Sequence, residues 1–281
     1  MDSILLSYRH SYHAGNFADV LKHIVLIEIL LHLGKKDKAF DYIDTHAGAG
    51  LYDLRSVHAE KLQEYQTGIV KLNAADWPEL GRYFEVVNKL NTDGVLRLYP
   101  GSPLIARHFM RPQDRAWLFE LHSEDARLLA NNLQRNKHAR VMHEDGLKGL
   151  LTLLPPVSRR GLVLIDPSYE IKSDYDLVTK TVIEAHKKFA VGSYAIWYPV
   201  VERSRISRME KQLINSGIPH IQRFELAITG DDSPGMTSSG MIVINPTWQL
   251  MATMQALLPK LCKTLATDND AFFKADVLVT E

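Results

Sequence analysis

AFDYIDTHAGAG, at residues 39–50, joins an apolar run to a glycine-rich turn. The run predicts a buried strand over residues 39–44, because a short apolar segment bounded by turn signals is typical of a strand covered on both faces. A strand that leads straight into glycines is typical of open α/β sheets, which bind ligands at the carboxyl ends of their strands. A strand–helix alternation is therefore expected on both sides of this stretch.

The alternation is present over most of the chain. Upstream, Asn16 can cap a helix that runs to about Leu33 and ends at Gly34. Downstream, strands are predicted at residues 116–120, 140–143, 161–165, 193–197, 221–228 and 241–244, with a final short strand at 274–279. Helices are predicted at residues 174–189, 203–215, 248–265 and 123–134, the last capped by Ser123. This pattern favours an α/β fold with a largely parallel sheet and helices on both faces.

One stretch breaks the alternation. Residues 54–98 contain helical segments at 59–72 and 78–90 and indicate a small helical insertion. The expected organisation is one α/β domain formed by residues 1–53 and 99–281, interrupted by an insertion subdomain at 54–98. Residues 1–15 form a polar, aromatic and basic N-terminal tail, which we expect to move when a ligand binds, because short unanchored termini are mobile.

Composition limits the class of protein. The chain has 281 residues, of which 46% are hydrophobic, and no uninterrupted apolar window long enough for a membrane span. Its start lacks the features of a signal peptide, and the single cysteine, Cys262, excludes a disulfide framework or a cysteine-based metal cluster. A cytoplasmic protein is expected. The net charge is zero, so contact with nucleic acid would require a local cluster of Lys and Arg on one face.

The glycine turn can be read in two ways. Gly48 and Gly50 let the backbone approach a ligand closely, but position 53 is Asp53, where a dinucleotide fingerprint needs a third glycine. An acidic residue is unfavourable beside a pyrophosphate, which favours a ligand without phosphate. S-adenosylmethionine is such a ligand, and its cationic sulfonium and amino groups would suit Asp44. A tight turn that packs a helix on the sheet is the alternative.

Two further acidic residues follow predicted strands. Glu120 could accept hydrogen bonds from both ribose hydroxyls of a nucleoside, because a carboxylate offers acceptors only. Alternatively it interacts with the dipole of the helix that begins at Ser123. Asp145, followed by Gly146, could accept from the exocyclic amine of a cofactor adenine.

The most specific motif is Asp166-Pro167-Ser168-Tyr169, directly after the apolar run GLVLI. It approximates the D/N-P-P-Y/F/W motif of methyltransferases that act on amino nitrogens. The lone pair of an adenine N6 is delocalised into the ring, so two acceptors, the Asp166 carboxylate and the Pro167 carbonyl, can localise it toward the methyl group. Tyr169 can stack on a flipped base. Ser168 replaces the usual second proline and loosens the loop; a plain strand-to-helix turn is the alternative.

Asn245-Pro246-Thr247-Trp248 also follows an apolar strand and resembles the same motif. The strand that it follows comes after two further strands, which is too late in the chain for the usual order. We interpret it as structural, or as a rim element near the substrate.

Basic residues and histidines gather near the N-terminus. This cluster comprises Arg9, His10, His13, Lys22 and His23. Metal binding is a rival interpretation for the histidines, but no carboxylate has the spacing of a third ligand, so no metal is expected. Further basic residues that could meet phosphates are Arg107, Arg111, Arg115, Arg159, Arg160, Arg203, Arg205 and Arg208.

Several long stretches resemble a known family. They are SYRHSYHAGNFADVLKH, DTHAGAG, YPGSPLIAR, SRRGLVLIDPSYE, WYPV and GMTSSGMIVINPTW. Together they resemble the bacterial 23S rRNA (adenine-N6) methyltransferase J family over nearly the whole chain. The resemblance implies a Rossmann-like class I S-adenosylmethionine-dependent methyltransferase domain with a helical insertion. It also implies methylation of one adenine in 23S rRNA near the peptidyl-transferase region, with a preference for protein-free rRNA, and we expect a monomer.

The resemblance also implies roles for individual residues. The cofactor and catalytic set would be His23, His46, Ser102, Glu120, Asp145, Gly146 and Asp166. The substrate-facing set would be Tyr8, His10 and Lys22. The alternatives are an enzyme of the same fold that acts on DNA adenine or protein glutamine, and a catalytically silent RNA-binding module. A nicotinamide oxidoreductase is disfavoured by Asp53.

Overall fold

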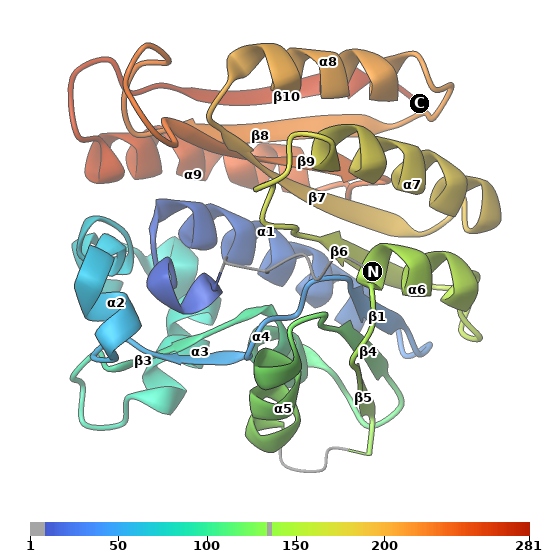
Figure 1. Cartoon of the computed structure of the whole chain (residues 1–281), viewed down its shortest axis with the longest axis horizontal. Helices are drawn as coiled ribbons and strands as arrows, with labels where there is room; N and C mark the ends of the chain where they lie inside the picture. The colour runs from blue at the N-terminus through green and yellow to red at the C-terminus, as the bar shows by residue number, and fades with distance from the viewer. Residues whose placement is uncertain (1–8, 134–136) are drawn as a thin grey trace.

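The computed structural model describes residues 9–133 and 137–281. Within these ranges an eight-stranded sheet has the order β10-β8-β9-β7-β6-β1-β4-β5 (Figure 1). Its strands are β1 (Asp41–Asp44), β4 (Arg115–Phe119), β5 (Ala139–Met142), β6 (Gly161–Ile165), β7 (Ser193–Val200), β8 (Ile221–Ala227), β9 (Ser238–Ile244) and β10 (Phe273–Val279). The predicted strands are therefore confirmed, although β9 begins three residues earlier than expected.

Strand direction decides where the chain can build a site. β5, β4, β1, β6 and β7 run parallel, so their carboxyl ends share one edge of the sheet. β9 runs antiparallel to both β7 and β8, and β10 antiparallel to β8. After β1 the chain builds β4 and β5 on one side of it and then crosses to β6 on the other side. In open α/β sheets the crevice that binds a ligand lies at such a switch point, which here is the carboxyl edge between β1 and β6.

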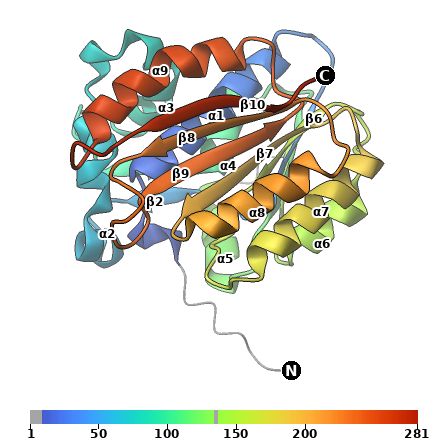
Figure 2. The ribbon, with the colours of Figure 1, turned by 90° about the horizontal axis from the view of Figure 1, so that it is seen from above.

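Helices cover both faces of the sheet, as Figure 2 shows. On one face, α1 (Phe17–Gly34) packs against β6, β7 and β9, and α9 (Leu250–Leu265) packs against β8 and β10. The other face carries α6 (Gly146–Leu153), α7 (Asp174–Lys188) and α8 (Arg203–Ile214). All of β6 is buried, as its unbroken apolar sequence predicts for a strand covered on both sides.

α1 begins as the sequence predicts. The Asn16 side chain accepts a hydrogen bond from the Asp19 backbone N–H at 2.9 Å, so it caps the helix. The helix runs through the middle of the molecule and contacts α3, α4 and α9 as well as the sheet. Its first turns lie beside the carboxyl edge, which brings the N-terminal cluster of basic and histidine residues toward the crevice.

The stretch between β1 and β4 contains a second, two-stranded sheet. β2 (Leu51–Asp53) pairs antiparallel with β3 (Leu98–Pro100), and the chain between them forms α2 (Val57–Leu62), short 3-10 turns and α3 (Gly81–Leu90). The helix predicted over residues 59–72 is wrong after Leu62. Gln63 turns into the left-handed region with φ 53°, and Gly68 lies so close to Gly15 that a Cβ would meet the Gly15 carbonyl oxygen at 2.1 Å. Packing against the start of α1 therefore overrides the helical periodicity.

Two short helices complete the sheet's flanks. α4 (Ser102–Phe109) follows β3 and packs on α1, and α5 (Ser123–Asn132) follows β4. The predicted cap of α5 is wrong: Ser123 is the first helical residue, and His122 caps the helix by accepting from the Asp125 N–H. His122 acts as the cap because its backbone is extended, as an N-cap requires, whereas Ser123 is already helical. Among the described residues, no helix combines the length and apolar character of a membrane span.

Candidate active site

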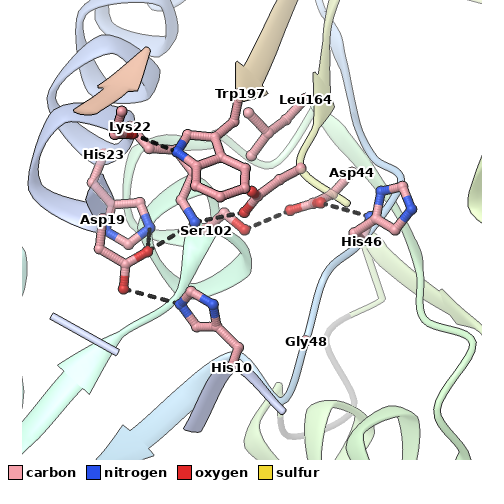
Figure 3. A network of polar contacts seen from close by, with 12 residues as sticks. His10, Asp19, Lys22, His23, Asp44, His46, Gly48, Ser102, Leu164 and Trp197 are labelled. Carbon is pink, nitrogen blue, oxygen red and sulfur yellow. Dashed lines mark hydrogen bonds and ion pairs between the residues drawn. The ribbon is translucent and has the colours of Figure 1, made fainter. Parts of the chain in front are cut away.

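Three acidic residues meet at the carboxyl edge of the sheet. Asp44 ends β1, Glu120 follows β4 and Asp166 follows β6. The strands that carry them are direct neighbours in the order β6-β1-β4. Figure 3 shows Asp44, at the end of β1, with Ser102 from α4 on one side and His46 on the other. The structure brings these residues together at one edge of the sheet, and their roles in a site stay predictions.

The glycine loop requires glycine. Gly48 has φ +60° and Gly50 φ +75°, which is the left-handed region that side chains with a Cβ avoid. A Cβ on Gly48 would also meet the Tyr52 hydroxyl at 2.2 Å. The Gly48 N–H donates to Glu120 Oε2 at 2.8 Å, which ties the loop to the neighbouring strand end. The loop is a tight turn, and it also lines the crevice at the switch point.

Glu120 holds two backbone groups. Its Oε1 accepts from the His122 N–H at 2.7 Å, and its Oε2 accepts from the Gly48 N–H. Burial raises the pKa of this carboxyl, against the lowering effect of these two N–H groups. Each carboxylate oxygen has two lone pairs, so one acceptor position per oxygen remains for a ligand hydroxyl.

Asp145 and Gly146 start α6 beside the end of β1. Asp145 Oδ1 accepts from the N–H groups of Leu147 and Lys148, so it caps the helix, and its Oδ2 lies 3.0 Å from Lys148 Nζ. A Cβ on Gly146 would approach the Thr45 carbonyl oxygen to 1.9 Å. The missing side chain therefore lets the helix N-terminus reach the crevice.

Asp44 is fully buried and already hydrogen bonded. Its Oδ2 accepts from the Tyr42 hydroxyl at 2.6 Å and from the Ser102 hydroxyl at 2.7 Å. Burial raises the pKa of the Asp44 carboxyl to about 6, so it is ionised at neutral pH. His46 lies next to it, with Nδ1 2.8 Å from Thr45 Oγ1, and burial lowers the His46 pKa to about 4. His46 is therefore neutral at pH 7.

Asp166 is paired with a lysine from the far end of the sequence. Lys22 Nζ donates to Asp166 Oδ2 at 2.5 Å and lies 2.8 Å from Asp19 Oδ1. Burial opposes the charge of Lys22, but Asp166 and Asp19 raise its pKa above the usual range. Burial raises the pKa of Asp166, against the lowering effect of Lys22. The ammonium is thus shared between two buried carboxylates.

Two histidines, His10 and His23, lie close to the carboxylate of Asp19. His10 Nε2 lies 3.0 Å from Asp19 Oδ2, and its ring packs against Tyr52. His23 is fully buried, its Nδ1 is 2.9 Å from the Tyr99 hydroxyl, and burial lowers its pKa to about 3. Its Nε2 has no hydrogen-bond partner among the described residues and lies 3.9 Å from Asp19 Oδ1. In the described part of the chain, no group of histidines and carboxylates is placed to hold a metal ion.

Tyr169 lies inside the wall of the site. It has φ +53°, is only 7% exposed, and its hydroxyl donates to the Trp197 carbonyl oxygen at 2.8 Å. Its ring packs 4.4 Å from that of Tyr175. Its neighbours cover most of the ring, so little of it is open to a ligand. That Tyr169 stacks on a base stays a prediction. The Pro167 carbonyl, by contrast, accepts no hydrogen bond within the described residues.

The chain is similar to known proteins over nearly its whole length. Residues 37–276 match the family model described as "Ribosomal RNA large subunit methyltransferase D, RlmJ". The "Ribosomal RNA large subunit methyltransferase J" of Haemophilus influenzae is 50% identical, covering 99% of this chain and 100% of that protein. Its namesake from Escherichia coli is 54% identical, covering 91% and 92%. The chain belongs to this family of ribosomal RNA methyltransferases.

A solved structure agrees with this assignment. The crystal structure of a Legionella pneumophila protein superimposes with a TM-score of 0.86 at 34% identity, covering 94% of this methyltransferase and 98% of that chain. The α/β architecture with its crossing at β1 is that of the predicted Rossmann-like class I methyltransferase fold. The fold class expected from the sequence is therefore confirmed.

The second motif of this methyltransferase, at Asn245, lies at the opposite edge. β9 is antiparallel to β7 and its Ile244 pairs with Tyr194, near the start of β7. The Asn245 side chain donates to the carbonyls of Ala190 and Gly192. Because β9 is antiparallel to β7, this turn lies at the edge of the sheet away from Asp166, and its contacts favour the structural interpretation.

Many of the arginines proposed for phosphate contact are engaged elsewhere. Arg111 and Arg160 donate to carbonyls at the end of α1, at the edge opposite the crevice. Carboxylates pair with Arg203, Arg205 and Arg208. Arg9 pairs with Glu124 at 2.6 Å beside the site. Tyr8, predicted to face the substrate, lies outside the described residues.

Sequence reasoning missed two residues of the site. Asp19 contacts His10 and Lys22, and Trp197 has its ring centroid 5.9 Å from Lys22 Nζ. Asp19 could have been found from its spacing, because residues three and four apart on a helix share a face, and Lys22 and His23 follow it at these distances. Trp197 carried no local signal beyond its place near the end of a buried strand.

Proposed function

We propose that this methyltransferase transfers a methyl group from S-adenosylmethionine to N6 of one adenine in 23S rRNA. The observation that carries the proposal is the position of Asp166 and Pro167, which follow β6 directly and face the glycine loop across the crevice between β6 and β1. Open α/β sheets bind their ligands there. The loop supplies the cofactor side of the crevice, and the Asp166 motif supplies the substrate side.

The residues present fit this cofactor. Gly48, Gly50 and Gly146 form a cradle in which a Cβ would clash with neighbouring atoms. Glu120 has free lone pairs for two ribose hydroxyls, and Asp145 for an exocyclic amine. Asp44 supplies negative charge next to Ser102 and His46. Bound there, S-adenosylmethionine supplies an electrophilic methyl group on a cationic sulfur.

Asp166 and Pro167 act on the incoming adenine. The Asp166 carboxylate accepts a hydrogen bond from one N6 hydrogen and the Pro167 carbonyl accepts one from the other, which concentrates the nitrogen lone pair on the side that faces the methyl group. When N6 takes the methyl group, Asp166 or a water takes the proton that the nitrogen loses. Lys22 binds only Oδ2 of Asp166 in the structure, so Oδ1 keeps its capacity as an acceptor. Holding the reactants in line supplies much of the rate.

The aromatic wall positions the base. An adenine must leave its stack before N6 can be reached, and single-stranded or loop RNA makes this easier. Tyr169 and Trp197 share a hydrogen bond and enclose the side of the crevice next to Asp166. We assign Tyr169 the role of an aromatic contact to the base, and we assign Tyr8, His10 and Lys22 roles in binding the substrate.

RNA is the proposed substrate because the two curated relatives are named ribosomal RNA large subunit methyltransferases. A chain with zero net charge suits recognition of one structured site better than general coating of nucleic acid. We further propose that the substrate is protein-free rRNA or an early assembly intermediate and that the enzyme acts as a monomer. Methylation of naked 23S rRNA but not of assembled large subunits, together with a monomer mass by light scattering, would support both points.

The decisive experiment is methyl transfer from labelled S-adenosylmethionine to protein-free 23S rRNA, with digestion and identification of the modified nucleoside. We expect N6-methyladenosine with the wild type and none with Asp166→Ala. RNase treatment of a mixed RNA, DNA and protein substrate should abolish incorporation. Label in DNA or protein would support the proposed methyl transfer but contradict RNA as the substrate. Binding of the cofactor without any transfer would favour the silent RNA-binding module.

A further inference from the structure

Asp19 is a buried carboxylate without a role in the reaction described so far. Its side chain is 1% exposed and lies in the first turn of α1. Oδ2 accepts from the Gly15 N–H at 2.8 Å and contacts His10 Nε2, while Oδ1 lies 2.8 Å from Lys22 Nζ. A carboxylate that only anchored the start of the helix would not need the ammonium on its other oxygen.

Asp19, Lys22 and Asp166 form one row of charges, and Figure 3 shows Asp19 beside Lys22. Lys22 lies between Asp19 and Asp166 and is 4% exposed, and the Asp166 side chain is 11% exposed. With the His10 ring counted as neutral, two carboxylates and one ammonium sum to one negative charge. Burial opposes ionisation of Asp19, but the contact with His10 and the Lys22 ammonium hold its pKa well below the usual range, so Asp19 is ionised at neutral pH.

We propose that Asp19 is a positioning residue that sets the charge of the catalytic site for a cationic cofactor. Without it, Lys22 and Asp166 would cancel, and only the more distant carboxylates such as Asp44 would remain to distinguish a sulfonium from a neutral thioether. Asp19 acts through Lys22. Because Asp19 and Asp166 share the Lys22 ammonium, the negative charge of Asp166 is only partly neutralised and remains effective toward the ligand. The site therefore prefers the charged substrate form of the cofactor over its demethylated product, which aids product release.

This inference rests on the proposed use of S-adenosylmethionine, and its test needs no RNA. The affinities of S-adenosylmethionine and S-adenosylhomocysteine are measured by calorimetry at pH 8, where an ordinary imidazole is uncharged. Asp19→Asn keeps an oxygen for the Gly15 N–H but removes one negative charge. We expect the preference for S-adenosylmethionine over S-adenosylhomocysteine to fall roughly tenfold, as expected for a unit charge near a partly buried cation.

Two further variants separate charge from structure. Lys22→Gln makes the row more negative and should raise the preference, whereas the double variant Asp19→Asn/Lys22→Gln restores one negative charge and should return it to the wild-type ratio. These two variants keep the test valid even if Asp19→Asn alone does not fold. The matched control is Asp41→Asn: Asp41 is also buried but lies at the start of β1, where it accepts from the Trp117 indole N–H. In Asp41→Asn the ratio of the affinities for S-adenosylmethionine and S-adenosylhomocysteine should not change.

The outcomes distinguish this inference from the proposed function. Equal weakening of both ligands by Asp19→Asn, while the wild type methylates RNA, would overturn the charge role alone. Failure of the wild type to bind S-adenosylmethionine would overturn the proposed function as well. A tenfold change in the ratio that the double variant reverses supports the inference even if the methylated substrate proves not to be RNA.

Discussion

Two four-residue turns in this methyltransferase look alike and lie at opposite edges of one sheet. Asp166-Pro167-Ser168-Tyr169 follows β6, and Asn245-Pro246-Thr247-Trp248 follows β9. Both come after a fully buried apolar strand, and both contain a residue with positive φ, Tyr169 in the first and Asn245 in the second. The direction of the preceding strand alone separates them. β6 points into the crevice, and β9 points away from it.

The polar groups at the two turns are used differently. At the first turn the Asp166 carboxylate accepts from the Lys22 ammonium through Oδ2. The Pro167 carbonyl accepts no hydrogen bond within the described residues. At Asn245 the side-chain amide is consumed by the carbonyls of Ala190 and Gly192 at 2.8 and 2.7 Å. A turn whose acceptors remain open can act on a ligand, whereas a turn whose groups are all paired holds the fold.

The largest expected effect is at Asp166. Asp166→Ala should lower kcat for RNA methylation by about 10²–10⁴-fold, as for loss of a positioned acid–base group. Asp166→Asn keeps one acceptor oxygen and should retain more activity than the alanine variant. Single-turnover methyl transfer measures both. Equal activity of Asp166→Ala and wild type would show that the turn after β6 has no chemical role.

The reverse pattern is expected at the second turn. Asn245→Ala removes two hydrogen bonds to the carbonyls of Ala190 and Gly192 and places alanine at φ +49°, a left-handed conformation that asparagine tolerates better, which should cost about 1–3 kcal/mol of stability. Its methylation rate per folded molecule should match the wild type. Chemical denaturation and the same single-turnover assay test this, and a lost rate with unchanged stability would contradict the comparison.

Glycines at the two edges sharpen the contrast. Gly146 lies at the catalytic edge, where an added Cβ would meet Thr45 backbone atoms at 1.9 Å, so Gly146→Ala should destabilise the protein by about 1–3 kcal/mol through overpacking. Gly34 ends α1 at the other edge with nothing within 4 Å of an added Cβ. Gly34→Ala should be neutral or stabilise by up to about 1 kcal/mol. Thermal melts compare the two, and equal losses would contradict the close packing at Gly146.

Much of this contrast follows from the sequence, and part of it does not. The positions of the strands along the chain and the position of Asp166 after GLVLI could be predicted, because apolar runs and glycine turns are local signals. The pairing of Lys22 with Asp166 could not be derived from periodicity, since it joins segments separated by 144 positions. The break of the helix after Leu62 was missed because its cause, the close approach of Gly68 to Gly15, is tertiary.

Histidines at the two ends of α1 give a smaller, pH-dependent effect. Burial lowers the pKa of His23 to about 3, below the unfolded value of 6.5, so the unfolded chain binds a proton that the folded chain rejects. Stability from this residue is complete above pH 6.5 and falls as pH drops, by up to about 1.4 kcal/mol per unit. His32, partly exposed at the other end, also has a lowered pKa.

We therefore expect the stability difference between wild type and His23→Gln to shrink steeply from pH 6.5 toward pH 4. The difference for His32→Gln should change less, because His32 lies nearer the surface. Urea denaturation at several pH values measures both slopes. Parallel pH dependence in the two variants would mean that His23 is less well shielded from solvent than its position suggests.

The smallest effect is expected at Ser168, where this chain departs from the two-proline form of the motif. Within the described residues the Ser168 backbone N–H makes no hydrogen bond, so proline would remove no contact there. Ser168→Pro should stabilise the protein by roughly 0.4–1 kcal/mol, because proline restricts the unfolded chain. A stiffer loop should also hold the Asp166 and Pro167 oxygens in register and raise kcat slightly, with KM for RNA unchanged. A loss of stability would show that the backbone at Ser168 differs from the proline angle, and that serine lets the turn after β6 adopt a shape that the two-proline motif forbids.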